Sequence, residues 1–151
     1  MTGACVNAQR RWASSLLYTS RGSLSGMMLS VMLGGALGAL CRHLTALAVQ
    51  PLLQGTTLAG FPLATLTVNV LGSLLLSLLF FANTSNLSPA LQTAIGTGFL
   101  GSFTTFSAFE LDTYKLAQEA QWAWVSLYVT GNLTLGFGAI VLGRALAQRL
   151  L

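Results

Sequence analysis

The sequence has few charged side chains and almost no acidic ones. Only 7% of its 151 residues are charged, whereas a soluble domain carries roughly 25%. This shortage of charge predicts a protein that is embedded in a membrane. The three acidic residues, Glu110, Asp112 and Glu119, all lie in the last third of the chain.

Several function classes are excluded by what is missing. The chain has one histidine, His43, and its two cysteines, Cys5 and Cys41, show no metal-ligand or redox spacing. The seven basic residues are scattered and form no run with interleaved aromatic residues, which argues against nucleic-acid binding. No catalytic constellation and no nucleotide-binding motif occur. We therefore expect neither an enzyme nor a pump driven by ATP hydrolysis.

Apolar sequence is abundant instead. Hydrophobic residues make up 54% of the chain, and its mean hydropathy is +0.72. A helix that crosses a bilayer needs about 20 mostly apolar residues. Ser88 followed by Pro89 predicts the start of one such helix. The chain is thus predicted to be an all-α membrane protein with four transmembrane helices, at about residues 27–49, 61–82, 90–116 and 122–147.

Residues 1–26 differ from the rest because they are polar and carry three arginines. We expect either a disordered basic extension or a segment that is not translated because synthesis starts at Met27 or Met28. Residues 27–151 then form the transmembrane domain. Both ends of a four-span chain lie on one side, and the basic residues favour the cytoplasm for both. Without the extension the bias is two basic residues against one, so the chain can insert either way up.

Polar residues inside the predicted spans recur at helical spacing. Those of the second span fall every fourth residue and share one side of a helix: Thr65, Asn69, Ser73 and Ser77. The fourth span carries two such rows: Tyr128, Asn132 and Gly136, and then Ser126, Thr130 and Thr134. Small polar residues hold membrane helices together, but an asparagine amide has four hydrogen-bonding positions to satisfy. The rows indicate either a polar track through the membrane or contacts between helices.

Rows of small residues characterise the first span. Gly34 and Gly38 lie four apart, and Gly35 and Ala39 form a parallel row. Such rows let two helix backbones approach closely, so we expect this face to meet another helix. Arg42 continues the first row near the end of the span. There it either marks the membrane interface or draws anions toward the mouth of a pore.

The stretch GTGFLGSFTTFSAFE, residues 96–110, falls inside the predicted third span. Its three glycines each weaken a helix by about 1 kcal/mol relative to alanine, and hydroxyl residues follow them at once. Broken backbone at membrane depth is tolerated where protein or a water-filled cavity surrounds it. Carbonyl groups that such a break sets free can bind a cation. We therefore expect a break in the third helix that faces a partner or a pore.

Three phenylalanines of this stretch are spaced three apart: Phe103, Phe106 and Phe109. A helix that resumes after the break would place them on one side. Ordinary packing is one interpretation of this spacing. The other uses the positive edge of an aromatic ring, which can face a small anion in a dry site.

The chain resembles the Fluc (CrcB-type) fluoride channel family over about residues 31–143. Three blocks carry the resemblance: GGALGALCRH (34–43), FPLATLTVNVLGS (61–73) and GTGFLGSFTTFSAF (96–109). The resemblance implies a fluoride-selective channel that exports fluoride passively across the bacterial inner membrane. It also implies an antiparallel, dual-topology homodimer of four-helix subunits, or a dimer with an oppositely inserted homologous subunit.

The functional positions of the family carry over residue by residue. The resemblance implies a fluoride path lined by Asn69, Phe106, Phe109, Thr65, Ser107, Tyr128, Asn132 and Thr134. It implies that backbone carbonyls of Gly101 and Thr104 hold a structural sodium ion (Na+) at the dimer interface. Arg42 matches the arginine that ends the first block and would lie at the pore mouth or the interface.

One position departs from the family pattern. Ala108 stands where the family usually has threonine, between the two phenylalanines of the path. A hydroxyl group is therefore missing beside the expected path. Thr105 and Ser107 supply the neighbouring hydroxyls.

Two other functions stay open from the residues alone. A small proton-coupled multidrug or cation exporter needs a carboxyl group in its membrane core, usually on its first span. This chain offers only Glu110 near its core and no acid before it. A helical assembly subunit that transports nothing would use the polar rows as contacts only.

Overall fold

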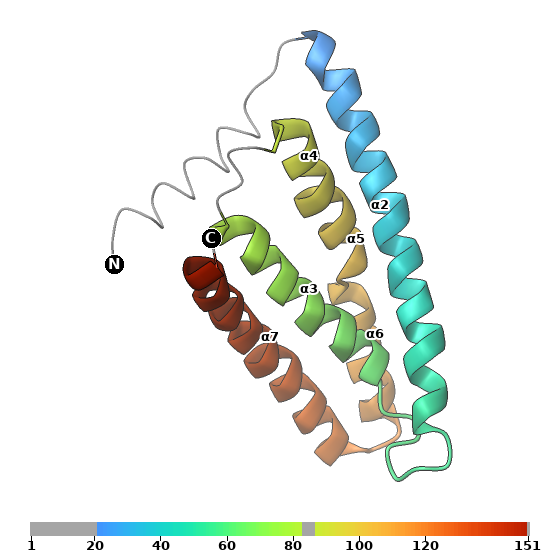
Figure 1. The fold of residues 1–151 in the computed structure, drawn as a ribbon. Coiled ribbons are helices and arrows are strands. Elements are labelled where there is room, and N and C mark those ends of the chain that lie inside the picture. Colours follow the sequence, from blue (N-terminus) through green and yellow to red (C-terminus); the bar gives the residue numbers. More distant parts are fainter. Residues whose placement is uncertain (1–20, 83–86, 151) are drawn as a thin grey trace.

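The computed structural model describes residues 21–82 and 87–150. This part of the chain contains helices joined by short connections and no strand, and its long helices lie side by side (Figure 1). Three helical stretches are long and apolar enough to cross a membrane: Leu24–Leu53, Leu63–Phe81 and Trp122–Arg149. A helix can span lipid because it satisfies its backbone polar groups internally. With several such helices, the chain is a multi-pass membrane protein.

Helix α2 (Arg21–Val49) starts the bundle and is followed by the 3₁₀-helix η1 (Gln50–Leu53). α2 begins six residues before the boundary expected at Met27, because no proline interrupts the turns in front of it. Part of the predicted extension is therefore helical. Its residues 1–20 lie outside the described residues.

Helix α3 (Leu63–Phe81) returns along the bundle, and α7 (Trp122–Leu150) ends it. Between them lies a third segment of four consecutive pieces: α4 (Pro89–Thr93), the π-helix η2 (Ala94–Leu100), α5 (Gly101–Phe103) and α6 (Phe106–Gln118). The Oγ of Ser88 accepts a hydrogen bond from the Leu91 N–H at 3.3 Å, which confirms the predicted N-cap. Figure 1 shows α2 and the third segment running one way and α3 and α7 running back.

The third segment changes its packing partner part-way along. Its first pieces, α4, η2 and α5, pack against α2, whereas α6 packs against α7. Helix α3 packs chiefly against α7. The bundle therefore has two principal seams, one between α2 and the first half of the third segment and one between α3 and α7.

The first seam is made of glycine. A methyl group on Gly34 would overlap the Ala94 carbonyl oxygen, and one on Gly38 would overlap that of Phe99. From the other side, a methyl group on Gly98 would come within 2.7 Å of the Val31 carbonyl oxygen. We call Gly34, Gly38 and Gly98 the glycine seam. The predicted helix contact of the glycine row is confirmed.

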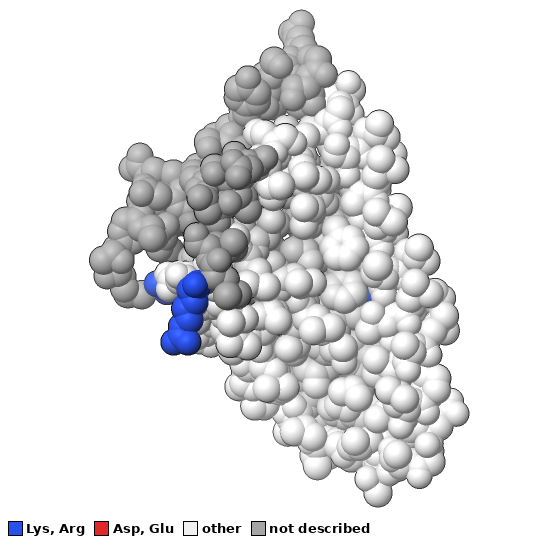
Figure 2. Space-filling view, viewed as in Figure 1, with Lys and Arg blue, Asp and Glu red and all other residues white. Residues whose placement is uncertain are grey.

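The outer surface is apolar over most of the bundle. Figure 2 shows this face as almost uncharged, with basic side chains beside the end of α7 and one small basic patch among the white side chains across from it. The last turns of α7 carry Arg144 and Arg149. The Arg144 guanidinium lies 5.5 Å from the ring centroid of Phe81. Large apolar side chains of α2 are exposed, such as Met32 and Leu33. This surface suits a lipid environment.

Candidate functional site

The third segment leaves helical geometry at Thr104 and Thr105. Thr104 has φ −78° and ψ 159°, and Thr105 has φ −153° and ψ 117°. Gly96 and Gly98 remain in the π-helix η2, so the chain straightens after Phe103 and not at the glycines. The extended Thr105 is the N-cap of α6, because its Oγ1 accepts a hydrogen bond from the Ala108 N–H at 3.2 Å.

Two backbone N–H groups depart from the helical pattern here. In a continuous helix, Thr105 N–H would bond to the Gly101 carbonyl and Ala108 N–H to the Thr104 carbonyl. Instead, Thr105 N–H donates to Asn69 Oδ1 at 2.9 Å and Ala108 N–H donates to Thr105 Oγ1. The carbonyls of Gly101 and Thr104 therefore lack their helical donors. Carbonyl oxygens are ligands that suit an alkali cation.

The Asn69 side chain pairs with the backbone of Thr105. Its Oδ1 accepts from the Thr105 N–H, and its Nδ2 donates to the Thr105 carbonyl oxygen at 3.3 Å. Asn69 Nδ2 also donates to Asn132 Oδ1 at 3.0 Å, and Asn132 Nδ2 donates to the Tyr128 carbonyl oxygen at 3.0 Å. The straightened turn is thereby tied first to α3 and then to α7.

A carboxyl group joins the same helices one turn away. Asp112 Oδ2 accepts hydrogen bonds from Thr65 Oγ1 at 2.8 Å and from the Tyr128 hydroxyl at 3.4 Å. The Tyr128 side chain is 0% exposed. The sequence reasoning did not place Asp112 in the site. The sequence did contain a pattern that could have indicated it: Asp112 follows Phe109 by three residues and so lies on the same side of α6.

We call Thr65, Asn69, Ser77, Tyr128 and Asn132 the polar seam. Ser77 belongs to it because its Oγ donates to the Ile140 carbonyl oxygen at 2.6 Å. The predicted rows of the second and fourth spans thus face each other. Asn69 and Ser77 bond across the seam, and Asn69 also bonds to the straightened turn. Thr65 and Tyr128 meet at Asp112 of α6.

Phe106 and Phe109 lie on the first turn of α6. Their ring centroids are 5.8 Å apart, with the planes at 47°. Phe109 is 7% exposed and packs 5.4 Å from the Tyr128 ring, whereas Phe106 is 73% exposed. Phe103 does not join them, because it precedes the straightened turn and stacks on Phe99 instead.

Two hollows flank the straightened turn, and Thr105 lines both. The arginine hollow, of about 330 Å³, is lined by Ala39, Arg42, His43, Ala46, Ala64, Thr65, Val68, Thr105 and Ala108. The phenylalanine hollow, of about 300 Å³, is lined by Asn69, Gly72, Ser73, Leu76, Gly96, Leu100, Gly101, Thr104, Thr105 and Phe106. The predicted anion donor, the exposed phenylalanine and both predicted carbonyl residues therefore meet in one hollow.

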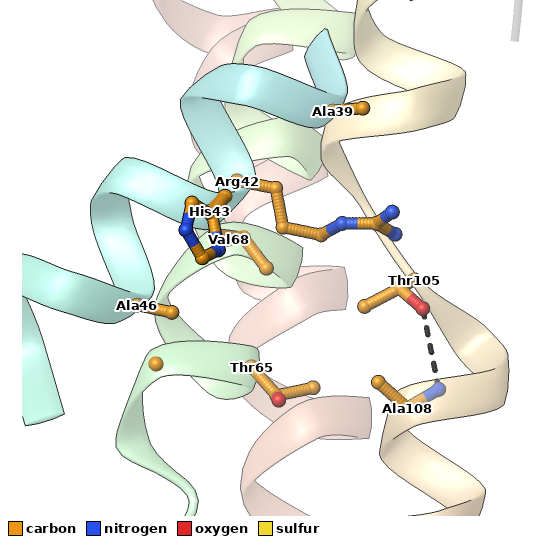
Figure 3. Close-up of a pocket in the computed structure, with 9 residues that line it drawn as sticks. Ala39, Arg42, His43, Ala46, Thr65, Val68, Thr105 and Ala108 are labelled. Atoms are coloured by element: carbon orange, nitrogen blue, oxygen red, sulfur yellow. Dashed lines mark hydrogen bonds between the residues drawn. The ribbon is translucent and has the colours of Figure 1, made fainter.

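Arg42 reaches across the arginine hollow from α2 toward the segment that carries Thr105 and Ala108 (Figure 3). Its side chain is half-buried. Within the described ranges no carboxyl group forms an ion pair with it. The guanidinium therefore gives this hollow a positive charge that is not paired directly with a carboxyl group.

Two of the expected path residues lie apart from these groups. Ser107 is on the exposed side of α6, with its Oγ 3.4 Å from Thr105 Oγ1, and it lines neither hollow. Thr134 is exposed, and its hydroxyl donates to the Thr130 carbonyl oxygen within α7 at 2.7 Å. Ser126 bonds in the same way to Trp122. In the second row of α7, the hydroxyls of Ser126 and Thr134 therefore bond within their own helix and do not join the polar seam.

Comparison with known proteins decides the family. The family model described as "CrcB-like protein, Camphor Resistance (CrcB)" matches residues 29–144. The chain belongs to the CrcB-like family. The matched region contains both seams, both hollows and the straightened turn.

Curated relatives of this CrcB-like chain carry a functional name. The "Fluoride-specific ion channel FluC" of Saccharophagus degradans is 40% identical over 126 residues, which cover 82% of this chain and 91% of that protein. The "Fluoride-specific ion channel FluC 2" of Listeria monocytogenes is 43% identical over 119 residues, with coverages of 78% and 87%. The "Fluoride-specific ion channel FluC" of Erythrobacter litoralis is 40% identical over 124 residues, with coverages of 80% and 90%.

Proposed function

We propose that this CrcB-like chain is a fluoride-selective ion channel, which lets fluoride leave a bacterial cell passively through the inner membrane. One observation carries the proposal beyond the family name. The Asn69 amide and the exposed Phe106 ring line the same hollow, beside a backbone turn that has left helical geometry. The Asn69 N–H donor and the positive edge of the Phe106 ring thus lie close enough together to replace part of the hydration shell of an anion.

The proposed path runs along the polar seam. Fluoride is small and strongly hydrated, so it needs donors throughout a narrow passage. Asn69 supplies N–H groups, and Phe106 and Phe109 supply ring edges at a centroid separation of 5.8 Å. Thr65 and Tyr128 are further proposed members of the path, and in this structure each donates its hydroxyl hydrogen to Asp112. Fluoride would have to compete with that carboxyl group for them. Ser107 remains a proposed member at the exposed end of the path.

Arg42 is the proposed anion collector at the pore mouth. Its guanidinium faces the arginine hollow, whose far wall is Thr105. A positive charge in a concave, partly apolar site concentrates anions there. The hollow is thus a proposed vestibule on one side of the straightened turn.

A second subunit completes the proposed channel. Phe106 is 73% exposed in the single subunit. An exposed aromatic ring next to polar groups is poorly suited to face lipid, so its exposure supports a partner subunit that covers it. The partner is an antiparallel copy of this chain or an oppositely inserted homologue. Inverted copies are compatible with the weak charge bias of residues 27–151, which carry Arg42, Lys115, Arg144 and Arg149 as their basic residues.

The sodium ion expected from the family fits the carbonyls at the straightened turn. Gly101 and Thr104 both line the phenylalanine hollow, and both have lost their helical donors. We propose that these carbonyls hold a structural Na+ at the dimer interface. The ion would supply positive charge that balances the free carbonyl dipoles.

The test is a fluoride-electrode measurement of efflux from liposomes that contain the purified chain. We expect rapid fluoride efflux and no chloride efflux above that of protein-free liposomes. Equal leakage of both ions, or of neither, would contradict the proposal. The readout also separates a channel from an assembly subunit that transports nothing.

Glu110→Gln tests the proton-coupled exporter. That alternative needs an essential carboxyl group, and the sequence offered Glu110 as the candidate near the core. That expectation is wrong, because the carboxyl group that contacts α3 and α7 is Asp112. The Glu110 side chain is exposed on α6 and lines neither hollow. A channel is expected to keep its full fluoride efflux in this variant, whereas an exporter that depends on Glu110 would lose transport.

A further inference from the structure

The two asparagine amides of the polar seam form a chain of hydrogen bonds with a fixed direction. At one end the Thr105 N–H can only donate, and at the other the Tyr128 carbonyl can only accept. Asn69 must therefore turn its oxygen toward Thr105, and Asn132 must turn its nitrogen toward Tyr128. The remaining groups, Asn69 Nδ2 and Asn132 Oδ1, then meet at 3.0 Å as donor and acceptor. Reversing one amide alone would oppose two donors or two acceptors.

The fixed direction of this chain determines which hydrogen bond of Asn69 an ion can replace. Asn69 Nδ2 has two hydrogens, one bonded to Asn132 Oδ1 at 3.0 Å and one to the Thr105 carbonyl at 3.3 Å. The bond to Thr105 is the longer and therefore the weaker of the two. Asn69 and Thr105 line the phenylalanine hollow, but Asn132 does not. An ion in that hollow thus reaches the weaker bond first.

Asn132 is poorly placed to bind an anion that enters the phenylalanine hollow. Its oxygen accepts from Asn69, and one hydrogen of its Nδ2 is donated to the Tyr128 carbonyl. Its second N–H does not line that hollow, whereas Asn69 does. An ion in the hollow therefore meets the Asn69 amide and not that of Asn132.

We propose that Asn132 is a positioning residue, which fixes the Asn69 amide so that entering fluoride replaces the Thr105 carbonyl as the acceptor of one Asn69 N–H. This inference rests on the proposed fluoride channel and revises the role expected for Asn132 from family resemblance. Asn69 keeps its other N–H on Asn132 while the ion is bound. The amide therefore cannot rotate its oxygen toward the anion.

The first test is nuclear magnetic resonance of the asparagine side-chain amides in the complete chain, purified in detergent. Addition of sodium fluoride, with sodium chloride as the control salt, should shift the Asn69 NH₂ signals and leave those of Asn132 in place. Asn132→Leu should alter the Asn69 signals already without fluoride, because the variant removes their fixed partner at nearly constant volume. A fluoride shift of the Asn132 signals as large as that of Asn69 would overturn the proposal, as would unchanged Asn69 signals in Asn132→Leu.

The second test is a double-mutant cycle measured as liposome efflux. Asn132→Leu and Asn69→Ser should each reduce fluoride efflux, and the double variant should be no slower than Asn69→Ser alone, because Asn132 acts through Asn69. Independent losses that multiply in the double variant would mean that Asn132 contacts the ion itself. Full efflux in Asn132→Leu would overturn the proposal as well.

A matched control replaces an amide outside the seam. Gln118→Met removes the exposed amide that donates to the Tyr114 hydroxyl at 2.7 Å on α6, and its efflux should equal that of the unmodified chain. Failure of the proposed function has a different signature. In that case the unmodified chain passes no fluoride, while the Asn69 signals in Asn132→Leu still report whether Asn132 orients the amide.

Discussion

The glycine seam and the polar seam hold the same third segment by opposite means. In the glycine seam, Gly34 and Gly38 remove side chains so that the backbone of α2 touches the carbonyls of Ala94 and Phe99. In the polar seam, side chains of α3 and α7 bond to one another and to the straightened turn. The first seam packs backbone directly against backbone. The second is built from side-chain hydrogen bonds.

The third segment leaves the glycine seam and reaches the polar seam at Thr104 and Thr105. A methyl group on Gly72 of α3 would overlap the Thr104 side chain, so α3 also needs a glycine where the third segment straightens. Asn69, three residues earlier on α3, then captures the Thr105 backbone. A rigid contact without side chains thus holds the segment in position, while the adjacent contact is made by side-chain hydrogen bonds that we propose an ion can replace. The following predictions test that division, from the largest expected effect to the smallest.

We expect Gly38→Val to have the largest effect, because it places a branched side chain against the Phe99 carbonyl. Overpacking costs roughly 1–3 kcal/mol even in side-chain contacts that can relax, and backbone relaxes less. The expected result is loss of folded, assembled protein in size-exclusion chromatography. Gly26→Ala on the same helix is the control, because no heavy atom lies within 4 Å of the added methyl group. Normal assembly of Gly38→Val would show that the glycine seam is not a rigid contact.

Replacing the aromatic rings should abolish transport and spare assembly. Phe106→Ile and Phe109→Ile keep apolar bulk but remove the ring edges that face an anion. Fluoride efflux should fall to that of protein-free liposomes, while the elution volume of the purified protein stays unchanged. Phe106 is the sharper test because its ring is exposed in the subunit. Efflux at the level of the unmodified chain from either variant would remove the rings from the proposed path.

Asp112→Asn should weaken the polar seam without destroying it. Thr65 and Tyr128 both donate to the same oxygen of Asp112, so asparagine can keep both bonds but removes the negative charge that strengthens them. We expect the unfolding free energy to fall by about 1 kcal/mol, the difference between a charged and a neutral hydrogen bond, and fluoride efflux to fall with it. Thermal unfolding in detergent and liposome efflux measure the two effects. Glu110→Gln is the matched control, because that exposed side chain lies outside both seams.

The smallest change is expected for Ala108→Thr. Ala108 lines the arginine hollow opposite Arg42, so the added hydroxyl would join the wall of the proposed vestibule. It would not touch the chain of amides. We expect efflux to change by no more than about threefold, which corresponds to roughly 0.7 kcal/mol. A change of a hundredfold would show that the vestibule, and not the polar seam, limits fluoride passage.

Much of the fold follows from local patterns. Long apolar runs predict the spanning helices because lipid leaves the backbone no other partners. The N-cap at Ser88 and the packing face of Gly34 and Gly38 are likewise readable, because each depends on a short spacing. Helix boundaries were less accurate: α2 extends to Arg21 although Gly22 and Gly26 lie in its first turns.

The site was only partly predictable for a physical reason. Spacing shows which polar residues share a side of a helix, so the rows of Asn69 and Asn132 could be identified. It does not show which atom donates to which, and Asp112 was missed because its partners, Thr65 and Tyr128, are on other helices. Phe103 was placed with Phe106 and Phe109 because the break was expected at the glycines before it, whereas the segment straightens after Phe103.

The sequence by itself determined the membrane setting, the all-helical class and the residue types available to handle an anion, because hydropathy and spacing are local properties. Only the tertiary structure decided where the third segment straightens and which donors are engaged there. These features depend on hydrogen bonds between residues that are far apart in the chain, which a local pattern does not reveal. Asn69 captures the Thr105 backbone, and Asn132 fixes the direction in which it does so.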